Sequence, residues 1–468
     1  MPSYSGTFRY ETSRDLSARP GPCTLDFDDE SLTVIPESGS PLSCDLGDIE
    51  RFSPLDYELQ LTLYPGEKLV LSRFGKAFQN LCHDLQEAYR NRTIQCLLLE
   101  DLEEIERFDG AAALESPDGS FSGSAEFRLC RSNLAVLPQG NAGMQWRLAE
   151  IDAVSFDEGQ YAVLIRSGEE ILRVSRLGKR TQEFQERLRD AMNGVSGRSA
   201  AAVRSVFPFL SPGQFRRAAD LLKEGRVASI YELAAIHEKT GPALIERVVS
   251  ARLKPYYDYL VSRTAPGEFY ASLRIIRKEE EAETADDAEE PTIDDPDGEG
   301  EEIGESDARP DAGDQEGSDD DILYSFIFPL RPRGGSGAPQ TAAWETTSKS
   351  GRATYFFRLT DPPATGAPGK SLKDAMEVDK AVRRLNRGLL LLNFRRAPIY
   401  LPDDALLMQP RYRRYAIASR KLPAVRFLRS SFLGRALHTS PEAWQGQVES
   451  LVAGGEGGIR THVQPFEP

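Results

Sequence analysis

The sequence predicts a multidomain α+β protein in which one small antiparallel domain occurs twice. Two stretches near the N-terminus, 4–92 and 107–195, match each other at a nearly constant offset. After them, hydrophobic periodicity changes from alternation to helical spacing. The charge then changes sharply between the acidic residues 279–321 and the basic residues 322–468. These three observations predict two repeats, a helical module, an acidic linker and a basic α+β domain.

The duplication is visible in segments that recur about one domain length apart. Residues 32–36, LTVIP, return at 134–138 as LAVLP. After a one-residue shift, residues 72–76, SRFGK, return at 175–179 as SRLGK. A match of this length, in register and with one gap, indicates two copies of one domain.

Both copies predict strands followed by one closing helix. Period-two alternation predicts half-buried strands. One such strand is expected in the middle of each copy, where Leu59, Leu61 and Leu63 align with Tyr161, Val163 and Ile165. Apolar residues at helical spacing then predict an amphipathic helix that covers the sheet. They are Phe78, Leu81, Cys82, Leu85 and Tyr89 in the first copy and Thr181, Phe184, Leu188 and Met192 in the second.

A run of antiparallel strands closed by one C-terminal helix resembles the pleckstrin-homology-like (PH-like) superfold, here over residues 4–195. The resemblance implies a β-sandwich or barrel that binds phosphoinositides, peptides or partner domains rather than a catalyst. A phosphoinositide site needs Lys and Arg in the first hairpin loop. The first copy offers Arg9, Arg14 and Arg19 there, but residues 115–120 of the second copy, ESPDGS, contain no base. We therefore favour protein or peptide binding, at an open sheet edge or along the helix groove.

Residues 205–276 are expected to form a small helical module. Ser211, followed by Pro212 and by Gln214, is a helix start signal. Three short helices separated by tight turns also fit a helix-turn-helix reader of DNA. The candidate recognition helix, 243–253, carries Glu246, Arg247 and Arg252. This small net positive charge is weak support for contact with phosphates. We interpret the segment as a packing or spacer module.

Residues 279–321 form the predicted acidic linker. They contain 22 Asp or Glu, one Arg and no aromatic residue. Such a composition cannot bury enough apolar surface to offset the entropy of ordering, which predicts an extended, disordered segment. Two interpretations remain open: a solvated spacer, or a tethered polyanion that docks on the basic C-terminal region and competes there with another anion.

Residues 322–452 predict a basic α+β domain, followed by a disordered tail, 453–468. The apolar run 322–330 predicts a buried strand, with 353–359 as a candidate hairpin partner. Residues 371–374, SLKD, resemble a capping box before a helix that buries Leu372, Met376, Val382, Leu385, Leu389 and Leu392.

Arginines with interleaved tyrosines mark a candidate contact surface for nucleic acid or another anion in this domain. Arginine holds phosphates and aromatic rings stack exposed bases. Alternatively, the aromatics belong to the core and the arginines form a solvated face that pairs with the acidic linker. The candidate residues are Arg383, Arg384, Arg387, Arg395, Arg396, Arg411, Arg413, Arg414, Tyr412 and Tyr415.

The sequence contains no pattern that organises catalysis. It has four His and five Cys, and none lies at a metal-binding, nucleophile-elbow or P-loop spacing. We therefore predict no catalytic, cofactor or metal site. The absence of C-x-x-C pairs, of a leader-like N-terminus and of a long apolar run predicts a cytoplasmic chain without a transmembrane segment.

The function predicted from these features is that of a non-enzymatic cytosolic adaptor. It would bind unidentified protein partners through the duplicated domains. The alternative is a protein that associates with nucleic acid or an anionic surface through residues 322–452, with the acidic linker as an internal competitor. The oligomeric state stays open.

Overall fold

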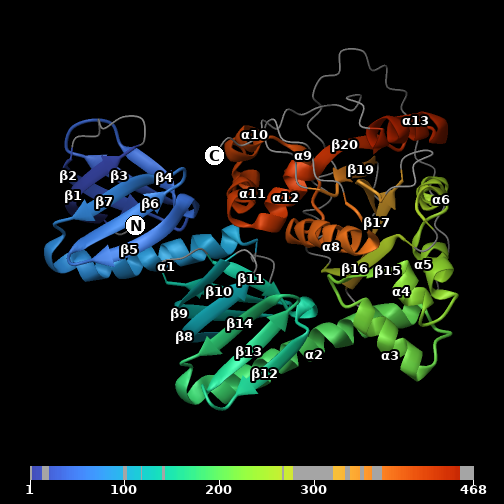
Figure 1. Ribbon diagram of the computed structural model, residues 1–468. Helices are drawn as coiled ribbons and strands as arrows, with labels where there is room; N and C mark the ends of the chain where they lie inside the picture. The colour runs from blue at the N-terminus through green and yellow to red at the C-terminus, as the bar shows by residue number, and fades with distance from the viewer. Residues whose placement is uncertain are drawn as a thin grey trace.

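The computed structural model describes residues 3–12, 20–98, 103–116, 119–139, 143–265, 268–277, 320–331, 338–347, 353–360 and 372–453. These form two seven-stranded antiparallel sheets, each followed by a helix, and a six-stranded antiparallel sheet between two layers of helices (Figure 1). The predicted disorder of 279–321 and 453–468 concerns residues that lie outside the described ranges, apart from Asp320, Asp321 and Ala453.

The first repeat is a curled sheet closed by a helix. Its strands run in the order β4-β3-β2-β1-β7-β6-β5, so β4 and β5 are its two edges. Only the short 3₁₀ turn η1 (Leu46–Asp48) joins these edges, so the sheet must curl enough to bring the end of β4 close to the start of β5. The elements are β1 (Ser3–Glu11), β2 (Gly21–Phe27), β3 (Ser31–Pro36), β4 (Leu42–Asp45), β5 (Ile49–Leu55), β6 (Glu58–Leu63), β7 (Glu67–Ser72), η2 (Gly75–Ala77) and α1 (Phe78–Cys96).

The second repeat has the same topology, with η3 (Leu148–Glu150) at the corner where the two edges meet. Each repeat has a core of its own, which its closing helix completes with residues such as Leu81 and Leu85 in one and Phe184 and Leu188 in the other. The elements are β8 (Glu104–Ser116), β9 (Gly119–Cys130), β10 (Asn133–Pro138), β11 (Met144–Arg147), β12 (Ala153–Asp157), β13 (Ala162–Ser167), β14 (Glu170–Ser175), η4 (Gly178–Arg180) and α2 (Thr181–Val206).

The motif shared by residues 72–76 and 175–179 has a backbone cause. Arg73 and Arg176 both have a positive φ, 62° and 58°, and the following Gly75 and Gly178 have 56° and 59°. The left-handed region is rarely adopted by residues other than glycine. The same unusual backbone at matching positions supports the duplication independently of the sequence match.

One part of the predicted alignment is wrong. Leu59 pairs with Leu71, whereas Val163 pairs with Val174, so Leu59 corresponds to Val163 and not to Tyr161. The turn between β12 and β13 is longer than the turn between β5 and β6. Tyr161 therefore lies in the turn, and its counterpart is Tyr57.

The six-stranded sheet contradicts the separation of residues 205–276 from residues 322–452. Its order is β15-β16-β17-β18-β19-β20, and β16 pairs with β17 from Tyr270↔Ile327 to Arg277↔Asp320. The acidic segment therefore connects two neighbouring strands of one sheet instead of separating two domains. The strands are β15 (Val227–Ser229), β16 (Tyr270–Arg277), β17 (Asp320–Leu330), β18 (Thr341–Thr346), β19 (Ala353–Arg358) and β20 (Phe432–Leu437).

Helices cover both faces of this sheet, and we call the whole assembly the three-layer unit. Ile327 faces one helical layer, while Phe326 and Phe328 face the other, which explains the continuous apolar run of β17. The first layer holds α8 (Ala375–Leu391), α9 (Ala397–Tyr400), α10 (Asp403–Met408), α11 (Pro410–Lys421) and α12 (Pro423–Ser431). The second holds the end of α2 with α3 (Pro212–Leu221), α4 (Ile230–Ala234), α5 (Thr240–Val248), α6 (Lys254–Arg263) and α13 (Pro441–Val452).

Local signals in this unit were predicted with mixed success. Ser211 caps α3 in a capping box with Gln214, as predicted. The cap of α8 is Asp374, whose side chain accepts from the Glu377 amide, rather than the predicted Ser371. Met376 is 64% exposed instead of buried. The strand β18 was missed, and it lies between the two strands that were predicted to form a hairpin.

No helix among the described residues combines the length and the apolar composition that crossing a bilayer requires.

Candidate functional site

Both repeats meet the three-layer unit at the same corner, the 3₁₀ turn where the two edges of each sheet join. In the first repeat, Asp48 of η1 accepts a hydrogen bond from Arg420 of α11 at 2.8 Å. In the second, Glu150 of η3 forms an ion pair with Arg387 of α8 at 3.1 Å. Asp48 and Glu150 occupy matching positions of the duplication. The two repeats therefore use matching carboxylates for this contact, although the helices that they meet, α11 and α8, are different.

The corner of the first repeat is organised by a buried carboxylate. Asp45 receives two hydrogen bonds from Arg92 of α1, at 2.9 and 2.7 Å, and its side chain is 2% exposed. Its Oδ2 also lies 3.5 Å from Nε of Arg413 on α11. The same carboxylate thus fixes the closing helix to the sheet and faces the three-layer unit.

Gly47 allows the two surfaces to approach closely. A Cβ atom at this position would lie 2.8 Å from Sγ of Cys96 and 3.0 Å from Cδ1 of Ile417. Any side chain at position 47 would therefore press against both α1 of the same repeat and α11 of the three-layer unit. The glycine is required by this contact and not by its backbone conformation, because its φ is not positive.

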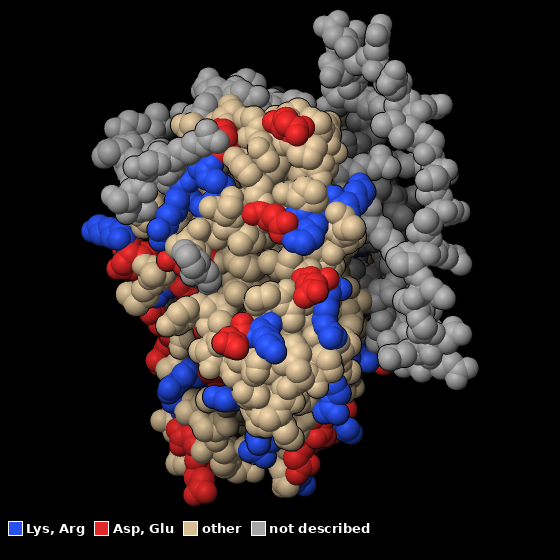
Figure 2. All heavy atoms as spheres, turned by 90° about the vertical axis from the view of Figure 1, so that its right-hand side faces the viewer, with Lys and Arg blue, Asp and Glu red and all other residues tan. Residues whose placement is uncertain are grey.

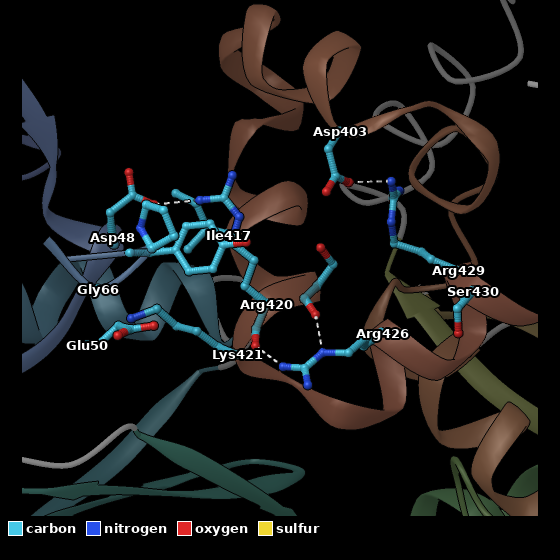
Figure 3. A pocket seen from close by; sticks show the side chains of 14 residues that line it. Asp48, Glu50, Gly66, Asp403, Ile417, Arg420, Lys421, Arg426, Arg429 and Ser430 are labelled. Atoms are coloured by element: carbon cyan, nitrogen blue, oxygen red, sulfur yellow. Dashed lines mark hydrogen bonds and ion pairs between the residues drawn. The ribbon is translucent and has the colours of Figure 1, made fainter. Parts of the chain in front are cut away.

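Beside this contact lies a cleft of about 580 Å³ between the first repeat and the helices α10 to α12. Figure 3 shows the Asp48–Arg420 pair on one side of the cleft and the Asp403–Arg429 pair on the other. The lining residues are Gly47, Asp48, Glu50, Tyr64, Pro65, Gly66, Asp403, Ile417, Ser419, Arg420, Lys421, Arg426, Arg429 and Ser430.

Each basic residue of the cleft has a partner within the protein. Arg420 lies over the Tyr64 ring at 4.4 Å, and Lys421 donates to the Ile49 carbonyl at 3.1 Å. Arg426 donates to the carbonyls of Ser419 and Arg420, which satisfies the last turn of α11. Arg429 donates to the Leu401 carbonyl and to Asp403, at 2.8 and 2.7 Å. The cations of the cleft thus support the fold and the docking.

Burial perturbs the charged groups of this corner. It lowers the pKa of Lys421 below the ordinary lysine value and raises the pKa of Asp48, an effect that the nearby Arg420 opposes. Both charged forms are poorly solvated here. The contact is therefore made by charged groups, but their attraction adds little net free energy because burial removes them from water.

At the corner of the second repeat, Arg147 occupies the position that Asp45 has in the first repeat. Burial against the three-layer unit lowers the pKa of Arg147 to about 10. Its guanidinium packs on Gly225, where a Cβ atom would lie 2.6 Å from Nη1. Ala135 and Leu137 of β10 join the apolar core beneath α8. The helix α2 continues from the second repeat into the opposite helical layer.

The structure contradicts a stacking role for the two predicted tyrosines. Tyr412 and Tyr415 are 5% and 2% exposed and belong to the core beneath α11, where a base cannot reach them. Arg395 is buried as well and donates to the Tyr415 hydroxyl. The sequence pattern of alternating arginine and tyrosine arises because one face of α11 enters the core.

Several predicted arginines are engaged in contacts within the chain. Arg383 bonds to Asp379 and to the Val227 carbonyl, and Arg387 and Arg413 face carboxylates of the repeats. Apart from Asp379, which lies four residues from Arg383 on α8, the partners are far away along the chain, so the sequence alone did not predict these contacts. The others also lie against protein groups: Arg384 over Phe427, Arg396 near Thr346, Arg411 over Tyr412 and Arg414 near Tyr415.

The face that carries α5 and α6, seen in Figure 2, shows basic and acidic side chains interspersed. Lys254 binds Asp258 at 2.7 Å, and Arg331 lies 3.1 Å from Glu268. This mixed pattern differs from the continuous positive surface that a phosphate backbone requires.

A buried polar cluster joins the six-stranded sheet to α13. His438 Nε2 lies 2.9 Å from Glu345 and 3.1 Å from the Thr354 hydroxyl, to which Trp444 also donates. The side chains of His438 and Glu345 are 2% and 1% exposed, so a substrate has no access to them. Within the described ranges, no three His, Cys, Asp or Glu residues are grouped closely enough to hold a metal ion.

Comparisons with known proteins give no family. No protein-family model matches the chain, and no curated protein matches it. Among solved structures, the PH domain of USP37 is 17% identical, with a TM-score of 0.17, over 19% of this chain and 97% of that one. The Spt16D–Pob3N heterodimer is 16% identical, with a TM-score of 0.15, over 36% of this chain and 84% of that one.

A structure of inhibited Vav1 is 15% identical, with a TM-score of 0.18, over 26% of this chain and 38% of that one. Similarity at this level does not define a family for the chain. The fold description above therefore depends on the topology of the chain itself.

Proposed function

We propose that the chain is a non-enzymatic adaptor whose two repeats are PH-like modules that bind a protein partner. The three-layer unit is the frame that sets the position of one repeat relative to the other. The observation that carries this proposal is the use of the same corner, η1 or η3, to attach each repeat. Equivalent attachment presents equivalent surfaces of the two repeats to a partner.

The orientation of the closing helices supports this role. In Figure 1, α1 and α2 both run from the outer end of their sheet toward the three-layer unit. At 1.5 Å per residue they span roughly 28 and roughly 39 Å. The N-terminal ends of both helices therefore lie far from the frame and are accessible to a partner.

Binding of nucleic acid through residues 322–452 gains no support from the geometry. Its candidate tyrosines are buried, and Arg383, Arg387 and Arg413 face carboxylates of the chain itself. A fragment that starts at residue 322 would also lack β16, the neighbour of β17. Any test of this alternative must therefore use the full chain.

Affinity capture with the full chain, at low and at high salt, tests the proposal. We expect a discrete protein partner at both salt concentrations. The purified partner should bind the variant Gly47→Val about tenfold more weakly, because displacing the first repeat removes the advantage of two-point attachment. Gly123→Ala is the matched control, since a Cβ there meets no atom within 4 Å. Retention of nucleic acid alone would overturn the adaptor proposal.

A further inference from the structure

The two repeats expose the same three side chains at their outer ends. Tyr57 is 71% exposed and Tyr161 is 56% exposed, at matching positions of the turns before β6 and β13. Their φ values, 57° and 48°, place both in the left-handed region. An exposed arginine lies next to each tyrosine, and an exposed lysine follows three residues after that arginine in the sequence. We call these groups the outer tips: Tyr57, Arg73 and Lys76 in the first repeat, and Tyr161, Arg176 and Lys179 in the second.

The pairing of the strands brings tyrosine and arginine together. Glu58 pairs with Ser72 at the end of the first ladder, so Tyr57 and Arg73 are the next residues outward on neighbouring strands. The second ladder continues in the same way from Val163↔Val174 to Tyr161 and Arg176. Two residues that are distant in sequence have therefore been retained together in both copies.

Each exposed tyrosine is held in place by a phenylalanine. The ring of Tyr57 lies 5.9 Å from that of Phe78, and the ring of Tyr161 lies 5.4 Å from that of Phe156. The two phenylalanines occupy different elements, α1 and β12, so the support was achieved separately in each copy. A ring held in this way loses little entropy when a ligand covers it.

The cations of the tips have no ion pair with any residue in the described part of the chain. Other charges nearby are engaged: Asp157 accepts from Arg173, and Glu58 accepts from Gln60. Asp56 and Glu158 are exposed in the turns beside the tyrosines. These two carboxylates oppose a ligand that carries many negative charges, such as an array of phosphates, more strongly than a ligand with a single carboxylate.

We propose that the two outer tips are equivalent docking points for short peptide segments of one partner protein, each with a carboxylate beside an apolar side chain. The guanidinium group binds the carboxylate in a bidentate manner and the tyrosine ring covers the apolar side chain. Tyrosine and arginine are the residues that most often dominate protein interfaces. This inference rests on the adaptor function and specifies the chemistry of the partner.

The test uses the full chain and two synthetic probes. The first is a labelled peptide with one Leu-Glu pair in a Gly/Ser background, and the second contains two such pairs joined by a long Gly/Ser linker. We expect the double probe to bind about tenfold or more tightly than the single one, because its second attachment is intramolecular. Changing one tip should remove this advantage, and changing both should abolish binding of either probe.

The variants are chosen to preserve the backbone. Tyr57→Asn and Tyr161→Asn keep a residue that tolerates the left-handed conformation, as do Arg73→Asn and Arg176→Asn. Tyr231→Gln is the control, because Tyr231 is an exposed tyrosine of the three-layer unit, 72% accessible. The proposal is overturned if the double-tip variant binds the probes as the unmodified chain does, or if phosphatidylserine vesicles bind in its place in a tip-dependent manner.

The same variants separate this inference from the adaptor function. A partner captured equally well by the double-tip variant would remove the role of the tips and leave the adaptor function intact. If the double probe binds in a tip-dependent manner but no partner is captured, the role of the tips is supported and the adaptor function is not.

Discussion

The first repeat contacts the three-layer unit through charged and polar groups of its corner and through Leu97 at the end of α1, whereas the second repeat shares a whole helix, α2, with it. On the first side, η1 meets Arg413, Arg420 and Lys421 of α11, next to an open cleft. On the second side, Ala135 and Leu137 belong to the same apolar core as α8, and α2 ends within the opposite helical layer.

This difference shows how copies of one domain can divide their tasks. We expect the second repeat to unfold together with the three-layer unit, because α2 contributes to both cores. The first repeat contributes only the end of α1, at Leu97, to the core of the three-layer unit, so we expect that its attachment can be weakened without unfolding either side. We therefore expect mutations in the two attachments to differ in how much they lower the free energy of unfolding and in how much of the chain they destabilise.

The largest effect is expected at the end of α2. Phe207 is 1% exposed in the core that α2 shares with the three-layer unit. Phe207→Ala should lower the free energy of unfolding by about 4 kcal/mol, because it leaves a cavity in a packed core. Phe209→Ala is the control, since Phe209 is 39% exposed and should change stability by less than about 1 kcal/mol.

Denaturant unfolding followed by fluorescence measures both variants. If Phe207→Ala loosens the second repeat while the three-layer unit keeps its stability, the two do not share a cooperative core.

A smaller effect is expected inside the first repeat. Arg92→Met leaves Asp45 buried without its bidentate partner, which should cost about 3 kcal/mol. The loss should be confined to the first repeat, as hydrogen exchange can show segment by segment. Arg9→Met is the control, because the Arg9 side chain is 53% exposed and its partner Glu11 is exposed as well. Equal losses in both repeats would contradict the independence of the first repeat.

The next effect concerns attachment and not folding. Gly47→Val should weaken the contact of η1 with α11 by about 2 kcal/mol, because the new side chain overlaps Cys96 and Ile417. Small-angle scattering should report a more extended chain, while each sheet keeps its hydrogen-exchange protection. An unchanged scattering profile would mean that other contacts hold the first repeat in place.

The sequence predicted the repeats because their signals are local. Alternating strands, the shared SRFGK and SRLGK motif and the closing helix can each be recognised in a short window. The error at Tyr161 has the same origin, since Tyr161, Val163 and Ile165 alternate as a strand would. Only the pairing of Val163 with Val174 reveals that the turn is longer.

The three-layer unit was predicted incorrectly because its organisation is non-local. The pairing of β16 with β17 joins strands on opposite sides of the acidic segment, and nothing in either strand encodes its partner. The site shows the same limit: Arg420 and Asp48 are 372 residues apart. The sequence indicated that the arginines of α8 and α11 form a candidate contact surface. The carboxylates of the repeats that pair with them become apparent only in the folded chain.

The smallest effect is expected from the pH dependence of the first attachment. Burial lowers the pKa of Lys421 in the folded chain, so the unfolded chain binds more protons between that lowered value and 10.5. Stability contributed by Lys421 therefore rises with pH across this window. Burial raises the pKa of Cys96 to about 11, which has the opposite effect above pH 9. The difference between the unmodified chain and Lys421→Met contains the lysine itself and its lowering of the Cys96 pKa, and both contributions favour the unmodified chain as pH rises.

We expect this difference to shift in favour of the unmodified chain as pH approaches 10.5, in denaturant titrations at each pH. Lys254→Met serves as the control for the substitution itself, since the Lys254 side chain is 54% exposed and does not line the cleft. A constant difference for Lys421→Met would show that water reaches Lys421 through the cleft. The charged groups of the first attachment would then be less buried than those of the second.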